Sequence, residues 1–222
     1  MDDGPSNPSK LQAGVVPVTP LQQNCTIVWD RVSLEGAVID PGGDVDNIMA
    51  ALDKCGADIK KIVLTHGHID HAGGASLLRE KLGVQIEGPH EEDRFLLESL
   101  EQTGAEYGIT DARNVEPDKW MVHGDVLTMA GCDWQVLHCP GHSPGSLVYY
   151  QKEASIALVG DVVFRGSIGR TDLPRGNHQD LLDAIRDHLL PLGDDVGFLC
   201  GHGPGSTLGH ERKTNPFLKG LS

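Results

Sequence analysis

Hydrophobic and polar positions form two kinds of pattern along the chain. Short apolar runs rich in branched residues indicate strands. The expected strands are 14–18, 24–29, 36–43, 61–65, 84–88, 125–131, 132–139, 145–151, 155–160 and 196–200. Apolar positions with the helical period, followed in several cases by glycine, indicate helices. The expected helices are 44–56, 76–83, 90–102 and 178–193, and residues 103–124 are expected to be an irregular insertion.

The order of these elements predicts the architecture. The strands between 125 and 160 follow one another at roughly ten-residue spacing, which is typical of a meandering sheet. One half of strands and helices followed by another predicts two sheets with helices outside them. The length of 222 residues fits one large domain, over 14–222. Residues 1–13, rich in Pro, Ser, Asp and Asn, are expected to be a disordered leader.

The candidate chemistry is concentrated in the segment THGHIDHAGG, residues 65–74. Here His66 and His68 are two positions apart after a predicted strand, so their side chains can point to the same side. Asp70 and His71 follow where a helix is expected to begin. A polar capping loop would explain one histidine, but it explains three histidines and an aspartate poorly. Imidazole and carboxylate ligands at this density favour zinc, iron or manganese over calcium or magnesium.

Three more candidate ligands follow predicted strands in the same way. They are His142, Asp161 and His202, each beside glycine in a turn. Each is a weak candidate alone, and Asp161 alone would be interpreted as a turn or helix cap. Together with the first segment they predict one metal centre at the rim of a sheet.

With these residues in place, the sequence resembles the metallo-β-lactamase superfamily, and within it the short bacterial form of glyoxalase II-type thioesterases. The segments that carry the resemblance are VTPLQQNC, IDPGG, LTHGHIDH, HCPGHSPG, GDVVFRGSIGRTDLPRG and GHGPGSTLGHERKTNPFL. They extend over nearly the whole chain. The resemblance implies an αββα sandwich of the α+β class, with two central mixed sheets flanked by helices.

The resemblance also implies how the ligands divide between two divalent metal ions, which would be zinc, with iron or manganese as alternatives. One ion would be held by His66, His68 and His142. The other would be held by Asp70, His71 and His202, and Asp161 would bridge both. All of these positions are filled, which argues against a metal-free descendant.

The implied activity is hydrolysis of a thioester, S-D-lactoylglutathione or a related hydroxyacylglutathione, by attack of a metal-bound hydroxide. Asp70 and Asp161 would be its catalytic residues, as well as ligands. A thiolate is a good leaving group, so the reaction needs no separate general acid.

Two residues are candidates for supporting the ligands from behind. Asp40, in IDPGG, could accept a hydrogen bond from a ligand imidazole and fix its tautomer. The alternative for Asp40 is a turn aspartate before Pro-Gly-Gly. Thr65 could act as a further donor, whereas Cys139 is interpreted as a small buried residue.

Candidate substrate contacts come from two basic segments. Arg165, Arg170 and Arg175 could receive an anionic substrate such as a glutathione thioester, and the alternative is a solvated loop with ion pairs to Asp161 or Asp172. By resemblance, Arg212, Lys213 and Asn215 could lie near the pocket for the thiol carrier. The chain ends soon after NPFL, so we do not expect the helical domain that holds glutathione in classical glyoxalase II.

Charge and cysteine usage narrow the other possibilities. A net charge of −14 argues against binding of nucleic acid or an anionic membrane surface. Five cysteines without a C-x-x-C pair favour a reducing, cytoplasmic setting. No secretory signal and no apolar run of about 20 residues is found, so no membrane helix is expected.

Several alternatives remain open at this point. A persulfide dioxygenase of the same fold uses one iron held by two histidines and an aspartate, and would not need the second ligand set. A lactonase or β-lactamase shares the hydrolytic chemistry but fits GRTDLPRG and NPFL less well. The alternative outside enzymes is a non-catalytic metal-binding module.

Overall fold

Two sheets lie face to face at the centre of the molecule. A computed structural model describes residues 10–221. The first sheet has the order β1-β2-β3-β4-β5, with β1 and β2 antiparallel to their neighbours and β3, β4 and β5 parallel. The second has the order β13-β12-β9-β8-β7-β6, in which only β12 and β9 pair in parallel. Both sheets are therefore mixed.

The strands of the first sheet are Leu11–Val18, Gln23–Asp30, Glu35–Ile39, Asp58–Val63 and Gln85–Glu87, for β1 to β5. Those of the second are β6 Val126–Met129, β7 Cys132–His138, β8 Leu147–Gln151, β9 Ile156–Leu158, β12 Gly197–Leu199 and β13 Ser206–Thr207. A separate hairpin joins β10 Val163–Phe164 to β11 Ser167–Ile168.

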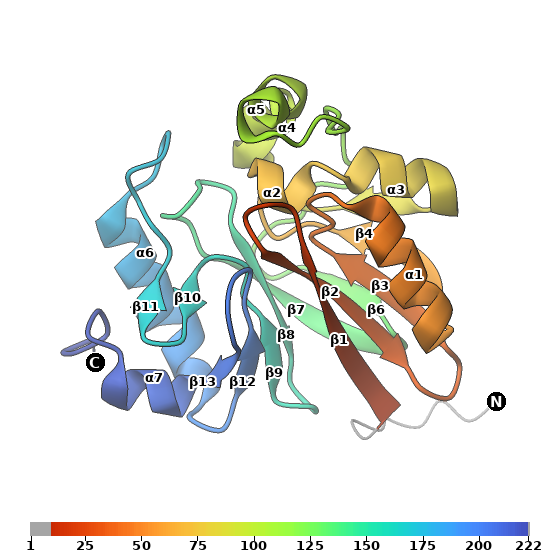
Figure 1. Cartoon of the computed structure of the whole chain (residues 1–222). Helices are drawn as coiled ribbons and strands as arrows, with labels where there is room; N and C mark the ends of the chain where they lie inside the picture. The colour runs from red at the N-terminus through yellow and green to blue at the C-terminus, as the bar shows by residue number, and fades with distance from the viewer. Residues whose placement is uncertain (1–9, 222) are drawn as a thin grey trace.

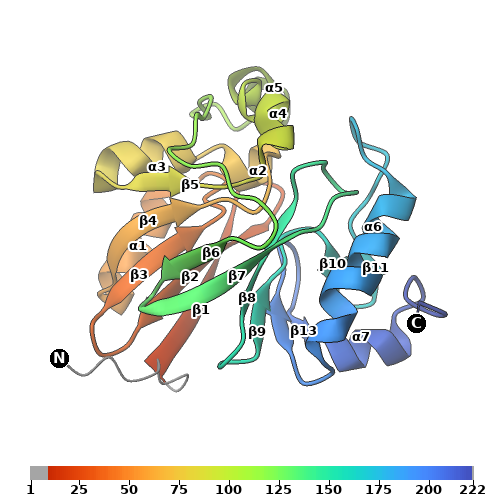
Figure 2. The ribbon, with the colours of Figure 1, turned by 180° about the vertical axis from the view of Figure 1, so that it is seen from behind.

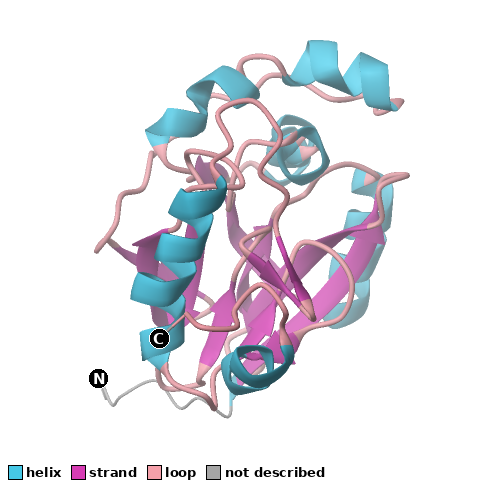
Figure 3. Ribbon diagram, turned by 90° about the vertical axis from the view of Figure 1, so that its left-hand side faces the viewer, coloured by secondary structure: helices cyan, strands magenta, loops and turns pink. Residues whose placement is uncertain are grey.

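Helices cover the outer face of each sheet (Figures 1 and 2). On the first sheet lie α1 Val45–Cys55 and α3 Ala75–Leu82, and on the second α6 His178–Ala184 and α7 Leu208–Thr214. Three further helices, α2 Ile69–Ala72, α4 Arg94–Leu97 and α5 Leu100–Tyr107, gather at one edge of the sandwich. Figure 3 shows the same order of layers from the side. The expected αββα sandwich is confirmed.

The alternation of side chains along each strand divides the core into three layers. In β2 and β3, Val28 and Ala37 face the second sheet, whereas Ile27 and Val38 face the helices α1 and α3. In β8, Tyr149 faces the first sheet, and its neighbours on either side pack toward α6. Strands buried on both faces are apolar without interruption, which is why their runs were recognisable in the sequence.

The structure departs from the sequence expectations at several elements. β1 begins at Leu11, earlier than the expected residue 14, because Leu11 pairs with Asp30 of β2. Residues 1–9 of the expected leader lie outside the described residues. The expected helix 90–102 is broken, since the Ser99 hydroxyl donates to the carbonyls of Phe95 and Leu96. The expected helix 178–193 is α-helical only to Ala184, and continues as a π turn and a 3₁₀ turn.

Four short elements were not expected: β10, β11, β13 and α7. The expectation that residues 103–124 are irregular is wrong for 103–107, because α5 continues to Tyr107. Within residues 10–221 we find no helix long and apolar enough to cross a membrane.

Candidate metal centre

Each candidate ligand lies in a connection that follows a strand, at the edge where α2, α4 and α5 gather (Figure 1). The loop after β4 carries His66 and His68, and α2 directly after it carries Asp70 and His71. The loop between β7 and β8 provides His142. Asp161 follows β9, and His202 follows β12. The ends of strands from both sheets thus bring the candidate ligands together. The sequence predicted this because each candidate follows a predicted strand.

The first group of candidate ligands is His66, His68 and His142. Their ring centroids lie 4.6 to 4.9 Å apart in nearly perpendicular orientations. His68 Nδ1 is 2.9 Å from His142 Nε2. One nitrogen from each imidazole can therefore approach a single ion.

The second group is Asp70, His71 and His202. His202 Nε2 is 3.1 Å from Asp70 Oδ2, and His71 Nε2 is 3.9 Å from the same oxygen. Asp161 lies between the two groups, because Oδ1 is 3.3 Å from His71 Nε2 and Oδ2 is 3.5 Å from His142 Nε2. The carboxylate of Asp161 thus faces both groups at once.

Asp40 and Thr65 form a hydrogen-bonded chain behind these imidazoles. His66 Nδ1 donates to Thr65 Oγ1 (3.0 Å), which donates to Asp40 Oδ2 (2.6 Å). The same oxygen accepts from His71 Nδ1 at 2.9 Å. Because Nδ1 carries the proton in both rings, Nε2 of His66 and of His71 is left with a lone pair. The backbone carbonyl of Arg170 holds Nδ1 of His142 in the same way, at 2.8 Å.

The donor set fits a metal on an observation independent of ligand type. Four buried side-chain atoms have no hydrogen-bond partner among the described residues, and three of them belong to candidate ligands: His66 Nε2, His71 Nε2 and Asp161 Oδ1. The fourth is Oε1 of Gln23. Buried polar atoms without partners are rare, and each needs an explanation. Metal binding by the two groups would satisfy these three atoms. Histidine and aspartate clusters able to hold a metal are therefore present in this structure.

Two imidazoles of the first group have lowered pKa values, which favours the uncharged form that can bind a cation. Burial, with repulsion from neighbouring histidines, lowers the pKa of His66 well below its usual value. Burial likewise lowers the pKa of His68 to about 3. Both imidazoles are neutral near pH 7, which is the form that binds metals.

The basic residues considered for substrate binding have different surroundings. Arg170 forms a bidentate pair with Asp172, and the Arg175 guanidinium lies 4.2 Å from the centre of the Phe95 ring. Arg165 is exposed, and within residues 10–221 no ion pair or hydrogen bond engages its guanidinium.

The C-terminal candidates Arg212 and Asn215 are engaged in contacts within the protein. Arg212 pairs with Asp194 and donates to the Leu190 carbonyl. Asn215 is fully buried and donates to the carbonyls of Phe164 and Ser167. Lys213 is exposed. Arg212 and Asn215 therefore hold α7 to the rest of the fold.

One buried carboxylate at this edge was missed by the sequence reasoning. Asp93 is fully buried, although its segment was expected to be an exposed helix. Nothing in the run of acidic residues 91–93 separates Asp93 from its two exposed neighbours.

A second histidine cluster lies close to the metal centre but is built differently. The His90 and His138 rings stack at 4.2 Å with only 16° between their planes. The ligand atoms of His90, Glu92 and His138 lie within 4.8 Å of one another, but the lone pairs of stacked rings lie in nearly parallel planes and do not converge on one ion. Each ring also has a partner, because His138 Nε2 donates to the Pro144 carbonyl and His90 Nδ1 accepts from the Glu92 amide. These histidines are not part of the candidate centre.

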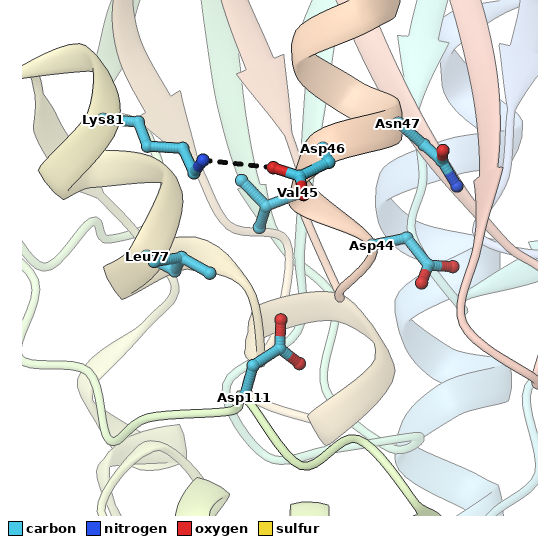
Figure 4. Close-up of a pocket in the computed structure, with 7 residues that line it drawn as sticks. All are labelled: Asp44, Val45, Asp46, Asn47, Leu77, Lys81 and Asp111. Atoms are coloured by element: carbon cyan, nitrogen blue, oxygen red, sulfur yellow. Dashed lines mark hydrogen bonds and ion pairs between the residues drawn. The ribbon is translucent and has the colours of Figure 1, made fainter.

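A cavity of about 360 Å³ opens elsewhere, between the start of α1 and α3 (Figure 4). Its charged lining residues are Asp44, Asp46, Asp111 and Lys81, and Lys81 pairs with Asp46 at 3.1 Å. None of the candidate ligands lines it, so this cavity is separate from the metal centre.

Residues 18–207 match the sequence family described as the Metallo-beta-lactamase superfamily. The chain belongs to this superfamily and is one of its metallo-hydrolases. It is 41% identical over 209 residues to the hydroxyacylglutathione hydrolase GloC of Haemophilus influenzae, covering 94% of this chain and 98% of that protein.

Two solved structures show the same fold over most of the chain. The B3 metallo-beta-lactamase BLEG-1 has a TM-score of 0.86 and 33% identity, covering 94% of this chain and all of the other. The di-iron-bound form of TTHA1623 has a TM-score of 0.83 and 35% identity, covering 92% of this chain and all of the other. The resemblance stated from the sequence is thus confirmed at the level of the superfamily.

Proposed function

We propose that the chain hydrolyses a hydroxyacylglutathione thioester with two divalent metal ions. The observation that carries the hydrolytic part is the pair of ligand groups facing one carboxylate, Asp161, with three buried atoms that a cation would satisfy. The 41% identity to a hydroxyacylglutathione hydrolase over nearly the whole chain supports the thioester as substrate.

In this proposal His66, His68 and His142 hold one ion, and Asp70, His71 and His202 hold the other. The ions, when bound, would supply Lewis acidity that lowers the pKa of a water and withdraws charge from the acyl carbonyl. Asp161 sets the spacing between the two groups. Asp40 and Thr65 keep His66 and His71 in the tautomers that offer Nε2 inward.

The substrate would enter on the side of His202. The His202 side chain is 32% exposed, whereas those of His71 and His142 are at most 4% exposed. The Phe164 ring lies beside His202, with centroids 6.2 Å apart. The apolar Phe164 ring, next to the partly exposed His202, offers a surface for the acyl group. Arg165 follows Phe164 in the chain.

A β-lactam is the second candidate substrate, because the 33% identical BLEG-1 is titled a B3 metallo-beta-lactamase. Both substrates present an acyl carbonyl to the same centre. The two proposals therefore differ in the pocket and not in the ligands.

A substrate screen on metal-reconstituted protein tests the function. We expect the metal-free chain to be inactive, and two equivalents of zinc, iron or manganese to restore hydrolysis, with the highest kcat/KM on glutathione thioesters. Higher kcat/KM on β-lactams or lactones would overturn the choice of substrate. Binding of two ions without hydrolysis of any of these would favour a metal-binding module. Thiol-dependent oxygen uptake by an iron-loaded protein would favour a persulfide dioxygenase.

We expect Arg165→Ala to raise KM for S-D-lactoylglutathione by about 3-fold with kcat unchanged, since an exposed charge pair contributes well under 1 kcal/mol. KM for the neutral N-acetylcysteamine thioester should not change. Steady-state kinetics on both substrates measures this. The matched control is Arg31→Ala, because residue 31 follows the end of β2 that is remote from His202. Equal effects on both substrates would contradict a charge contact.

A further inference from the structure

The fully buried Asp93 connects the two loops that carry the first ligand group. Its Oδ2 accepts from the backbone amide of Gly67, between His66 and His68, at 2.8 Å. The same oxygen accepts from the Ser143 hydroxyl at 2.8 Å, next to His142. Oδ1 accepts from the Gly145 amide at 2.6 Å. One carboxylate thus holds residues adjacent to all three histidines of that group.

Both loops have glycine where Asp93 approaches them. A Cβ on Gly145 would lie 2.5 Å from Asp93 Cγ. A Cβ on Gly67 would lie 3.2 Å from Asp93 Cβ and 2.9 Å from Leu96 Cβ. Neither glycine has a positive φ, so backbone conformation does not require glycine at these positions. Close packing against Asp93 and its helix does require it. The two loops are shaped around this side chain.

The bonds of Asp93 are directed away from its own helix. Asp93 stands at the N-cap of α4, but its side chain makes no capping bond there. A carboxylate with a merely local role would accept from the first amides of its helix. Here all of its hydrogen bonds go to the Gly67 loop and the 143–145 loop. Burying a charge is costly, and these three donors are what offset that cost.

We propose that Asp93 is a positioning residue that sets the spacing of His66, His68 and His142 and thereby the affinity of the first ion. The Asp93 carboxylate makes no hydrogen bond or ion pair with any of the three imidazoles. It fixes the backbone on either side of them, so the rings converge before a metal arrives. This inference rests on the two-ion centre proposed above, and it adds a control over metal affinity that no ligand provides.

Zinc retention against a competing chelator tests the proposal without any substrate. We expect the wild type to retain two ions. Asp93→Asn should bind the ion of the first group roughly 10- to 100-fold less tightly than the wild type does. His202→Ala should weaken the other ion. If Asp93 acts on the first group, Asp93→Asn and His202→Ala should each retain one ion at the same chelator concentration, and the double variant should retain none.

The matched control is Glu211→Gln. Glu211 is fully buried and accepts from the Gly166 amide and the Ser206 hydroxyl, but it contacts neither ligand loop. It should lose thermal stability and keep both ions. Ser143→Ala removes one donor to Asp93 and should give a smaller loss of affinity in the same direction, even if Asp93→Asn does not fold.

Retention of both ions with unchanged affinity by Asp93→Asn or, if that variant does not fold, by Ser143→Ala, would overturn the positioning role. So would an equal loss in Glu211→Gln. A wild type that retains two ions but cleaves no thioester would overturn the proposed substrate and leave the role of Asp93 intact.

Discussion

Asp161→Ala should lose metal-dependent thioester hydrolysis by a factor on the order of 10³, because the variant removes the carboxylate that faces both ligand groups. Lewis-acid stabilisation by a correctly placed ion contributes several kcal/mol, and each 1.36 kcal/mol is a factor of ten in rate. The Asp161 oxygens lie 3.3 Å from His71 Nε2 and 3.5 Å from His142 Nε2, so the variant removes the carboxylate proposed to bridge the two ions. The measurement is kcat/KM on S-D-lactoylglutathione, together with metal content.

The control for this loss is Asp53→Ala, which removes an exposed carboxylate from α1 and should leave kcat/KM unchanged. Thermal denaturation of both variants separates loss of the site from loss of the fold. Retention of activity by Asp161→Ala in metal-free buffer would contradict the hydrolytic mechanism.

The sequence predicted the layers of the fold well, because strands buried on both faces have nearly continuous apolar runs. The alternation of Ile27 and Val28 between two core layers is an example. The sequence predicted secondary structure less well where tertiary contacts determine whether a segment is helical. α7 has Gly209 in its first turn, which lowers helix propensity, yet that glycine lets the helix approach Asp194 closely.

The candidate ligands could be proposed from the sequence since each one follows a strand, and strand ends meet at a sheet edge. The pairing of distant residues could not be derived in that way. That Asp161 lies between His71 and His142 depends on how the two sheets stack. In the sequence, the division into two groups came only from resemblance.

Buried polar residues outside the motif were the least predictable. Asp93 follows two other acidic residues, and only the approach of the Gly67 and Gly145 loops distinguishes it. The sequence left two interpretations of Asp40, a turn residue or a residue that supports the candidate ligands. Its hydrogen bonds to Thr65 and His71 favour the second interpretation.

Gly201→Ala should abolish the second ligand group by adding a single methyl group. A Cβ at this position would lie 2.1 Å from Asp161 Oδ1 and 2.4 Å from His71 Cε1, so both side chains must move. Gly201 does not have a positive φ, and alanine therefore meets only this steric conflict. Displacement of ligands by about 1 Å can reduce activity roughly 100-fold, and we expect at least that loss in kcat/KM, with one ion lost.

The strand before Gly201, β12, provides the matched control Gly197→Ala, where the nearest atoms to the added methyl group lie at 3.9 and 4.0 Å. Gly197→Ala should keep both ions and full activity, because β12 accommodates its methyl group at ordinary contact distance. The measurements are the metal content, kcat/KM and melting temperature of the two variants. If Gly201→Ala folds and retains two ions at wild-type affinity, then Asp161 and His71 do not share an ion at the position proposed here.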